Sequence, residues 1–456
     1  MPQLPLIAHR HPDDAIAYRA GVTIPVHRFL ADVERMISAL LPGRHVFNMC
    51  SDRYHFSVVL AASIVSGRTS LLPSTHTPDT VRQMQAFAPD TFGVTDQDRS
   101  AVDLPTVRFP SGATAASARK PMPIPLIDSG RIVAHVFTSG STGLPVPHPK
   151  RWGSLVQSVR AEAERLGITP AHVILGTVPP QHMYGLESTV LLPLLTGAAL
   201  HAGRPFYPAD ICATLAALPR PRMLVTTPHH LKALLADQAP LPPADQLLSA
   251  TAPLSQNIAQ AAESRFAAPL FEIYGCTETG QLASRRTRES AEWQALGDVR
   301  LRREGDDIWV EGGHVDRPAA LSDVIELTGS HSTSATFLLH GRHADMVNIA
   351  GKRTSLAYLN YHLNAIEGVR DGVFLLPTGD DGDGVIRLAA LVVAPDLIPA
   401  ALVKALRERI DPIFLPRPLL FVDELPRNET GKLPTLPLQD LLAAWRAGRP
   451  TGSRNE

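Results

Sequence analysis

Apolar and polar positions along the first third of the chain follow two different periods, which predicts helices and strands in turn. Helical spacing runs over Phe29–Leu41 and again over Tyr54–Val65. Short apolar runs at His45–Met49 and Ser70–Pro73 indicate buried strands. Because helices that alternate with apolar strands favour parallel sheets covered by helices, we expect an α/β fold.

The same pattern continues from Arg131, where an apolar run predicts a strand, to about Phe337. Further strands are predicted at Val173–Val178 and Met223–Thr227, and the alternating Asp307–Glu311 is typical of a smaller β unit.

Beyond Arg342 the predicted elements become short, and a compact α/β module of about a hundred residues fits there. Pro110–Pro125, rich in Ser, Ala and Pro, is predicted to be a connector, and the polar tail Arg446–Glu456 to be frayed.

The composition excludes several classes of protein. The 456 residues are 44% hydrophobic and 19% charged, with a formal net charge of -1, which gives no field to attract nucleic acid or an acidic membrane. The N-terminus does not read as a secretory signal, and the longest apolar run, near Val190–Leu195, is too short to span a bilayer. Widely spaced Cys50, Cys212 and Cys276 are predicted to be reduced core residues. We therefore expect a cytoplasmic protein without a membrane span.

Candidate chemistry begins in the stretch VFTSGSTGLPVPHPK, Val136–Lys150. Hydroxyl side chains and glycines fill Thr138–Gly143, and glycine lets backbone N–H groups approach an anion, so such a loop can form a nest for phosphate. A Walker A loop needs a lysine directly after its last glycine, so an unrelated P-loop kinase or ATPase is poorly supported. Alone, the stretch would also fit a Ser/Gly-rich surface turn.

Three later segments change this interpretation. Phe271–Gly280 (FEIYGCTETG) places an aromatic residue suited to a purine and a carboxylate suited to magnesium at the end of an apolar strand. His340–Arg353 and Leu425–Leu433 (LPRNETGKL) follow in order. Each alone could be a turn or a solvated charge. Together, their order and spacing resemble the adenylate-forming superfamily of acyl-CoA synthetases, peptide-synthetase adenylation domains and luciferases.

The resemblance covers nearly the whole chain and implies a fold. A large N-terminal domain of layered α/β subdomains, residues 1–342, would bind ATP and the acid. A hinge, residues 343–345 with Ala344 and Asp345, would connect it to a small mobile α+β domain, residues 346–456. The site would lie between the two domains, where ligand clefts commonly occur.

The resemblance also assigns roles in ATP binding. The Thr138–Gly143 loop would wrap the β- and γ-phosphates, Tyr274 would stack on adenine, and Thr277 would touch the α-phosphate. Glu278 would hold Mg²⁺, and the ribose would meet an aspartate and an arginine. The implied ATP-binding positions are Thr138, Ser139, Gly140, Ser141, Thr142, Gly143, Lys150, Ala250, Thr251, Tyr274, Gly275, Cys276, Asp323 and Arg342.

Lys432 matches the lysine of the C-terminal domain that joins the carboxylate and the α-phosphate. A carboxylate attacking a phosphate brings two anions together, so a cation and Mg²⁺ must offset their repulsion. Without the surrounding motif, Lys432 would be a solvated turn lysine. The implied catalytic residues are Lys432, Glu278, Thr277 and His182.

The acid pocket is implied by Pro179–Leu186, which resembles the family's histidine motif. His182 would orient the carboxylate or gate the pocket, although it also fits an ordinary half-buried histidine. Thr226–His230 would begin the helix on the far wall; its two adjacent histidines point in different directions, which argues against a metal site. The pocket's mixed residues favour a small aromatic acid over a long chain. The implied pocket positions are His182, Met183, Tyr184, His230, Ser249, Ile273 and Gly275.

Three departures from the family pattern leave alternatives open. Val146 stands where the phosphate loop usually has lysine, so either Lys150 reaches back or this branch handles pyrophosphate without that cation. Ala344 and Thr435 replace a usual charged hinge residue and a usual arginine, although Asp345 could act at the hinge. A degenerate, non-catalytic nucleotide or acyl-adenylate binding protein is therefore one alternative.

The loop ending at Lys150–Gly153 is similar to short stand-alone ligases of aryl-polyene and xanthomonadin-type pigment pathways. We therefore expect ATP- and Mg²⁺-dependent activation of a small aryl acid, such as a hydroxybenzoate, to an acyl-adenylate. Rotation of the C-terminal domain would then bring Ala350 and Gly351 toward a thiol, that of CoA or of phosphopantetheine on a separate acyl carrier protein. A fatty-acid ligase is the second alternative.

Overall fold

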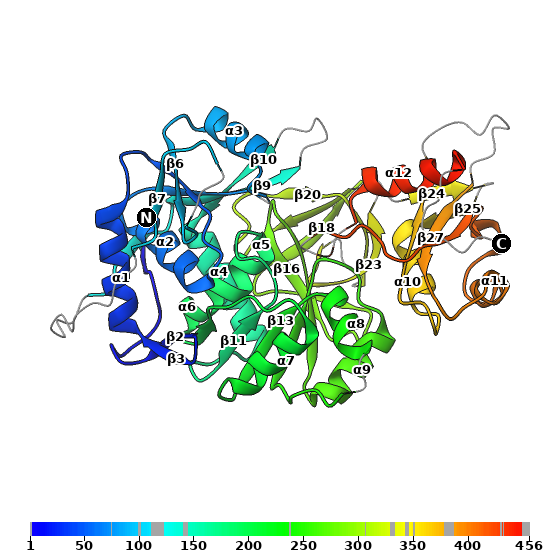
Figure 1. Cartoon of the computed structure of the whole chain (residues 1–456), viewed down its shortest axis with the longest axis horizontal. Coiled ribbons are helices and arrows are strands. Elements are labelled where there is room, and N and C mark those ends of the chain that lie inside the picture. The colour runs from blue at the N-terminus through cyan, green and yellow to red at the C-terminus, as the bar shows by residue number, and fades with distance from the viewer. Residues whose placement is uncertain are drawn as a thin grey trace.

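The computed structural model is elongated, with a smaller C-terminal part at one end of its long axis (Figure 1). It describes residues 2–73, 75–98, 102–110, 123–139, 145–236, 239–305, 307–328, 333–342, 346–349, 352–377, 387–428, 431 and 433–448. We call residues 2–342 the body and residues 346–448 the C-terminal part. Among the described residues, every cluster of buried side chains belongs wholly to one or the other.

The elements predicted from apolar spacing are present. The two early helices are α1 (Val26–Ala39) and α2 (Arg53–Val65), and the strand between them is β4 (His45–Asn48). The alternating strand predicted in the smaller β unit is β19 (Asp307–Glu311). Most of the predicted Pro110–Pro125 connector and the tail beyond residue 448 lie outside the described residues.

Two mixed sheets, each with a run of adjacent parallel strands, form the body. One has the order β10-β9-β5-β4-β6-β7 and the other β21-β23-β17-β16-β15-β14-β13-β11-β12-β2-β3. The largest buried cluster takes side chains from both sheets and from the helices α1, α2, α4 and α6. This layering confirms the predicted α/β fold class. The strands and helices not yet bounded are β2 (Ala15–Arg19), β3 (Val22–Pro25), β5 (Thr69–Leu72), β6 (Thr91–Thr95), β7 (Thr106–Arg108), β9 (Ile132–Ser139), β10 (Pro145–Arg151), β11 (Val173–Gly176), β12 (Ala199–His201), β13 (Arg222–Thr226), β14 (Gln246–Ser249), β15 (Leu270–Cys276), β16 (Gly280–Arg285), β17 (Trp293–Ala295), β21 (Asp323–Leu327), β23 (Thr336–Arg342), α4 (Trp152–Leu166) and α6 (Leu192–Thr196).

Helices cover the second face of the larger sheet, and smaller sheets complete the molecule. The helices α7 (Pro208–Ala217), α8 (Pro228–Ala236) and α9 (Gln256–Phe266) bury a separate apolar cluster against β11, β13, β14 and β15. The strand β19 lies in a four-stranded sheet of order β20-β19-β18-β22. The remaining strands of that sheet are β18 (Arg300–Glu304), β20 (Ala319–Leu321) and β22 (Thr333–Ser334).

The C-terminal part has its own sheet and helices. A three-stranded sheet, β26-β27-β28, packs against α10 and α11 on one side and α12 on the other. None of the described helices anywhere in the chain has both the length and the apolar character needed to cross a membrane. The elements here are the hairpin β24 (Met346–Ile349) and β25 (Lys352–Ser355), then α10 (Leu356–Asn364), β26 (Asp371–Leu375), β27 (Ala389–Val393), α11 (Pro399–Arg407), β28 (Leu419–Phe421) and α12 (Thr435–Arg446).

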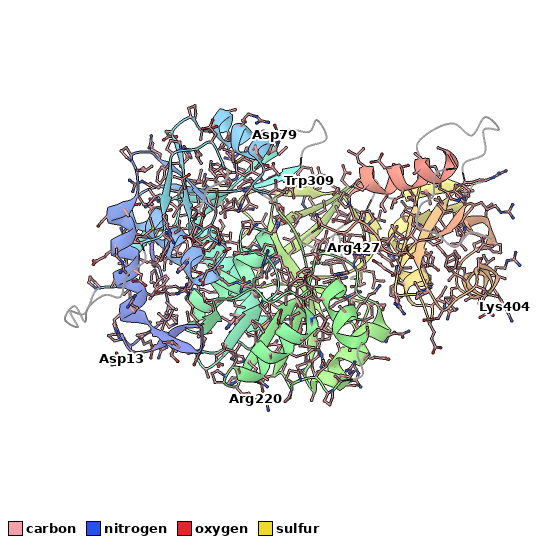
Figure 2. All side chains as sticks on the ribbon, in the orientation of Figure 1. Asp13, Asp79, Arg220, Trp309, Lys404 and Arg427 are labelled. Carbon is pink, nitrogen blue, oxygen red and sulfur yellow. The ribbon has the colours of Figure 1, made fainter. Side chains whose placement is uncertain are left out.

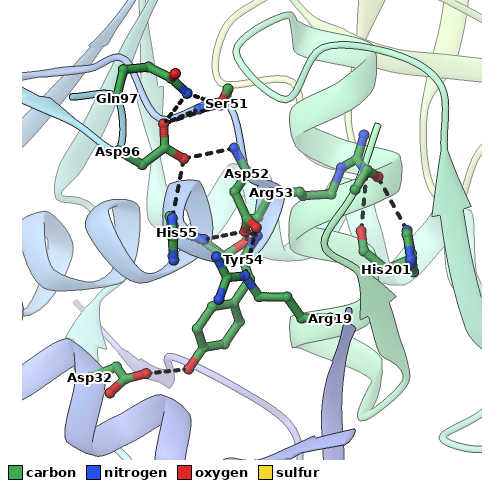
Figure 3. Close-up of polar contacts among 12 residues, drawn as sticks. Arg19, Asp32, Ser51, Asp52, Arg53, Tyr54, His55, Asp96, Gln97 and His201 are labelled. Atoms are coloured by element: carbon green, nitrogen blue, oxygen red, sulfur yellow. Dashed lines mark hydrogen bonds and ion pairs between the residues drawn. The ribbon is translucent and has the colours of Figure 1, made fainter. Parts of the chain in front are cut away.

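A polar network fixes the start of α2 and joins the two large sheets (Figure 3). Fully buried Arg53 donates to the Thr189 hydroxyl and to the carbonyl oxygens of Gly176, Val178, His201 and Gly203, at 2.8 to 3.2 Å. These carbonyls follow β11 and β12 of the larger sheet or end those strands, whereas α2 leads from β4 to β5 of the smaller one. All five N–H donors of the guanidinium are engaged, so burial leaves none of them without a hydrogen-bond partner.

The carboxylate of Asp96 holds the loop before α2 and gives the fold a pH dependence. It accepts hydrogen bonds from the backbone N–H groups of Ser51 and Asp52, at 3.0 and 2.9 Å, and from His55 at 3.2 Å. Burial alone would raise the pKa of Asp96, but these hydrogen bonds outweigh it and hold the pKa well below its usual value. A carboxylate whose pKa is lowered by folding stabilises the fold above its unfolded pKa, and this stabilisation is lost as the pH falls.

We expect Asp96→Asn to lower the free energy of unfolding at neutral pH by about 2 kcal/mol, because charge-assisted hydrogen bonds are lost. The variant should also lose less stability than the unmodified protein between about pH 5 and about pH 3. Urea denaturation at several pH values measures both effects. Asp98→Asn, whose carboxylate is 83% exposed, is the matched control. A pH dependence equal to that of the unmodified protein would contradict the assignment to Asp96.

Candidate active site

The carboxyl ends of the parallel strands in the larger sheet bring the candidate residues together. The strands β11, β13, β14 and β15 run parallel and side by side, and their ends lead into Thr177, Thr227, Ala250 and Thr277. In open α/β sheets, ligands bind in the crevice at this edge. The strands that flank the hydroxyl-rich loop, β9 and β10, belong to the other sheet.

The predicted phosphate loop is flanked by the antiparallel strands β9 and β10. The strands β9 and β10 pair with Thr138 opposite Val146 and Val136 opposite His148. Thr138 and His148 lie on the same face, with Oγ1 and Nε2 2.8 Å apart. Gly140–Gly143 lie outside the described residues, and of Ser139 only the backbone is described. The described part of the hairpin therefore presents a hydroxyl and an imidazole next to the loop.

Lys150 forms hydrogen bonds to the turn that carries the predicted magnesium ligand, Glu278. Its ammonium group donates to the carbonyl oxygens of Thr277 and Glu278, the latter at 3.2 Å, and the side chain is only 6% exposed. Burial lowers the pKa of Lys150, an effect that the nearby carboxylates of Glu187 and Glu278 oppose. In this conformation, the ammonium group holds backbone carbonyls of the turn. The hypothesis that Lys150 serves the phosphates stays a prediction.

Glu278 faces the hairpin across this turn. Its Oε1 lies 3.7 Å from Nε2 of His148, and its side chain is 52% exposed. Burial would raise the pKa of Glu278, but hydrogen bonds from its own backbone N–H and from Cys276, together with the charges of His148 and Lys150, bring the pKa below its usual value. The carboxylate is therefore ionised and open to solvent at neutral pH.

Tyr274, the predicted adenine contact, is fixed from two sides. Its ring packs against Trp293 and Phe337, with centroids 5.8 and 5.6 Å apart, and its hydroxyl donates to Oδ2 of Asp323 at 2.7 Å. Gly275 follows at a bulge between β15 and β16, where a β-carbon would lie 2.3 Å from the carbonyl oxygen of Gly280. Only glycine fits there, so the two backbones approach closely beside the ring.

Three further predicted ATP contacts are Asp323, Arg342 and Thr251. Asp323 pairs with Arg342 across the antiparallel strands β21 and β23, so the two ribose candidates stand opposite one another, although the Arg342 side chain is not among the described atoms. After β14, Thr251 has a φ of 82°, an unusual conformation for a β-branched residue. Such strain is often retained at binding sites because the surrounding structure imposes it.

The acid-pocket candidates differ in what their polar atoms can do. The hydroxyl of Tyr184 is engaged with the backbone carbonyls of Thr226 and Leu248, 3.1 Å from each, so only its ring can line a pocket. His230 is buried, and its Nδ1 lies 3.1 and 3.2 Å from the hydroxyls of Thr177 and Thr227. Burial, with the charges of His229 and Arg204, lowers the pKa of His230 to about 4.

His230 is therefore neutral, and its other ring nitrogen is available. Nε2 of His230 is buried and has no hydrogen-bond partner among the described residues. The same is true of the buried hydroxyl of Ser249. Both atoms can serve a ligand that carries oxygen.

The remaining pocket candidates lie near the turn. His182 is partly exposed and directly precedes the short helix α5 (Met183–Gly185). Met183 approaches the turn, since its Cε would lie 3.5 Å from a β-carbon on Gly280. Ile273 is 7% exposed in the core cluster between the sheets.

The C-terminal part reaches the same edge of the sheet. A β-carbon on Gly431 would lie 3.4 Å from Cβ of His229 and 3.8 Å from Oγ1 of Thr227. Gly431 is buried, has a φ of 76° and directly precedes Lys432. Lys432 itself, the predicted hinge Ala344–Asp345 and the predicted thiol-contact residues Ala350 and Gly351 lie outside the described residues.

Sequence reasoning missed His148 and gave no role to Arg427. His148 and Lys150 are two positions apart on β10 and therefore lie on the same face, and His148 is diagonally opposite Thr138. The period of two in a strand could have predicted this placement from the sequence. Arg427 was visible in the LPRNETGK motif, but its partner Asp371 lies 56 positions away in the chain.

Comparison with known proteins identifies the family. Residues 8–307 match the AMP-binding enzyme family. A 4-coumarate–CoA ligase of Rhodobacter capsulatus is 31% identical over 301 residues, 65% of this chain and 73% of the relative. A 3-hydroxybenzoate–CoA/4-hydroxybenzoate–CoA ligase of Thauera aromatica is 26% identical over 349 residues, 68% of this chain and 66% of that ligase. The structure of an anthranilate CoA ligase with anthranoyl-AMP superposes with a TM-score of 0.81 at 13% identity, over 98% of each chain.

At that identity the structural likeness establishes the fold alone, and this fold is that of an adenylate-forming enzyme. With well over half of its length matched, the chain belongs to the AMP-binding enzyme family. The superfamily predicted from the motifs is thereby confirmed. The narrower similarity to pigment-pathway ligases stays a prediction.

Proposed function

We propose that this protein is an AMP-forming acid–thiol ligase. It uses ATP to convert a small aryl acid to an acyl-adenylate and then passes the acyl group to the thiol of CoA. Two sets of contacts carry the proposal: His148 lies between Thr138 and Glu278, and Tyr274 donates to Asp323. Thr138, Glu278, Tyr274 and Asp323 each supply a group that one part of ATP requires. The relatives named for 4-coumarate and hydroxybenzoates support an aryl acid.

In the first step the chain's task is to bring two anions together. Glu278 fits Mg²⁺, because an ionised and half-exposed carboxylate is the oxygen ligand that this cation prefers. Bound there, Mg²⁺ would supply positive charge to the phosphate oxygens. Lys432 would add its ammonium group between the acid's carboxylate and the α-phosphate, so that the carboxylate oxygen attacks phosphorus and pyrophosphate leaves.

The acid would lie beside the turn and the ring of Tyr184. Its oxygen substituents can meet Nε2 of the neutral His230 and the hydroxyl of Ser249, since both atoms are buried and without a partner among the described residues. An unpaired buried polar atom costs free energy that a hydrogen bond to a ligand's hydroxyl would recover. This favours a hydroxylated aryl acid over a fatty acid.

In the second step the C-terminal part rotates about Ala344–Asp345 and withdraws Lys432. Ala350 and Gly351 then approach the thiol, which attacks the acyl carbon and displaces AMP. Exclusion of water protects the reactive mixed anhydride meanwhile. Phosphopantetheine on a separate acyl carrier protein is the other acceptor of the same chemistry.

Acid-dependent ATP–pyrophosphate exchange tests the proposal directly. The panel is 4-hydroxybenzoate, 3-hydroxybenzoate, 4-coumarate, benzoate and hexadecanoate, and we expect the hydroxylated acids to exceed hexadecanoate by about tenfold or more in kcat/KM. Thioester formation with CoA, compared with a phosphopantetheinylated carrier protein, then identifies the acceptor. Absence of exchange with every acid would refute the ligase and favour a binding protein without turnover.

A further inference from the structure

Polar side chains connect the body to the C-terminal part next to the residue that precedes Lys432. Lys232, on α8 of the body, donates from Nζ to Oδ1 of Asn364 at 2.7 Å. The same ammonium group lies 4.0 Å from Oδ1 of Asp371. Both acceptors belong to the C-terminal part, Asn364 at the end of α10 and Asp371 at the start of β26.

Within the C-terminal part, Asp371 continues the connection to the lysine loop. Arg427 forms a two-point ion pair with it, Nε to Oδ2 at 2.6 Å and NH2 to Oδ1 at 2.7 Å. The third guanidinium nitrogen donates to the carbonyl oxygen of Gly431 at 2.5 Å. Figure 2 labels Arg427 where the helices of the body meet the C-terminal part. We call Lys232, Asn364, Asp371 and Arg427 the interlobe bridge.

The bridge is shielded and its members are held in place. The side chains of Lys232, Asp371 and Arg427 are 25%, 15% and 18% exposed, so water screens them far less than an ordinary surface ion pair. The amide nitrogen of Asn364 donates to the carbonyl oxygens of Asn360 and Gly372, which turns its oxygen toward Lys232. Burial alone would raise the pKa of Asp371, but Arg427 and Lys232 bring it below its usual value. The carboxylate of Asp371 is therefore ionised at neutral pH.

The contacts of the bridge are of two kinds, those within the C-terminal part and the one that joins this part to the body. The contacts of Asp371, Arg427 and Gly431 lie within that part and travel with it. The contact of Lys232 with Asn364 joins the two parts and must break when they separate. It is made while Gly431, the residue before Lys432, rests against Thr227 and His229 at the carboxyl edge of the sheet.

We propose that Lys232 is a positioning residue for adenylation: its hydrogen bond to Asn364, reinforced by Asp371, holds the C-terminal part where Lys432 enters the site. This inference rests on the proposed function of Lys432. Lys232 touches neither substrate, so its loss changes how often the lysine is in place and leaves the chemistry of each step intact. The second half-reaction, which needs the C-terminal part elsewhere, does not use this contact.

The test compares the two half-reactions in Lys232→Met. We expect kcat for ATP–pyrophosphate exchange to fall by about fivefold to tenfold, with the KM for ATP and acid within about twofold. Thioester formation from supplied acyl-adenylate should be unchanged or faster. Lys232→Arg keeps the cation and should retain most of the exchange rate. Lys404→Met, which removes an exposed lysine from α11, is the control and should change neither half-reaction.

Amide hydrogen exchange gives a second readout that does not depend on catalysis. The segment 425–436 should exchange faster in Lys232→Met than in the unmodified protein or in Lys404→Met. Equal protection in all three proteins would overturn the inference, and so would an equal loss of both half-reactions or an unchanged exchange kcat. If the unmodified protein catalyses no exchange with any acid, the ligase proposal fails, and the amide measurement alone decides whether Lys232 holds this segment.

Discussion

Lys432→Ala is expected to lower the rate of acid-dependent ATP–pyrophosphate exchange by a factor on the order of 10³, because the transition state loses its mobile cation. Thioester formation from supplied acyl-adenylate should keep most of its rate, since the anionic attack is already complete in that substrate. The pair of half-reaction assays measures this separation. Gly431, the residue before Lys432, lies against Thr227 and His229 at the carboxyl edge of the sheet.

Matched variants make that result specific. Lys404→Ala removes an exposed lysine from the same part of the chain and should leave both rates unchanged. Lys432→Arg retains charge but changes its geometry and should recover only part of the exchange rate. If Lys432→Ala loses both half-reactions equally, the assignment of Lys432 to the first step is wrong.

Glu278→Gln is expected to lower the exchange rate by about 10²-fold and to raise the Mg²⁺ concentration needed for half-maximal rate, because the amide keeps the shape but loses the charge. The carboxylate is ionised and half exposed beside the hairpin of β9 and β10, and a magnesium ligand requires both properties. Exchange measured over a range of Mg²⁺ concentrations separates weaker metal binding from slower chemistry.

A control and a binding measurement complete this test. Glu367→Gln, an exposed carboxylate of the C-terminal part, should leave the Mg²⁺ dependence unaltered. Calorimetric titration with ATP should show that Glu278→Gln loses the enhancement of ATP binding by Mg²⁺. An unaltered Mg²⁺ dependence with normal ATP binding would remove Glu278 from the metal site.

The fold was predictable because its signal is local. The helices α1 and α2 and the strands β4, β13 and β19 each carry their own apolar period, so a window of a dozen residues suffices to recognise them. Their ends shifted by a few residues, as with α1, which begins at Val26 rather than Phe29. Such shifts arise because the cap geometry, and not the apolar pattern, sets where a helix begins.

The candidate site was predictable in its parts but not in its contacts. The order of the motifs predicted Tyr274 and Asp323 as site residues. Their hydrogen bond, however, depends on the positions of β15 and β21 within one sheet, which the motifs do not contain. Lys150 was expected near phosphate because the usual lysine is missing, whereas its ammonium group is directed at the carbonyls of a turn more than a hundred positions away. A one-dimensional pattern carries no information about such a partner.

The buried guanidinium of Arg53 has a consequence for how the molecule comes apart. It joins segments from both large sheets through five hydrogen bonds, so neither sheet can open alone without leaving a buried charge unpaired. Among the described residues, the C-terminal part shares no buried cluster with the body, and the hydrogen bond between Lys232 and Asn364 joins the two. We therefore expect the two large sheets to unfold together, whereas the rotation proposed for the C-terminal part would not require either sheet to open.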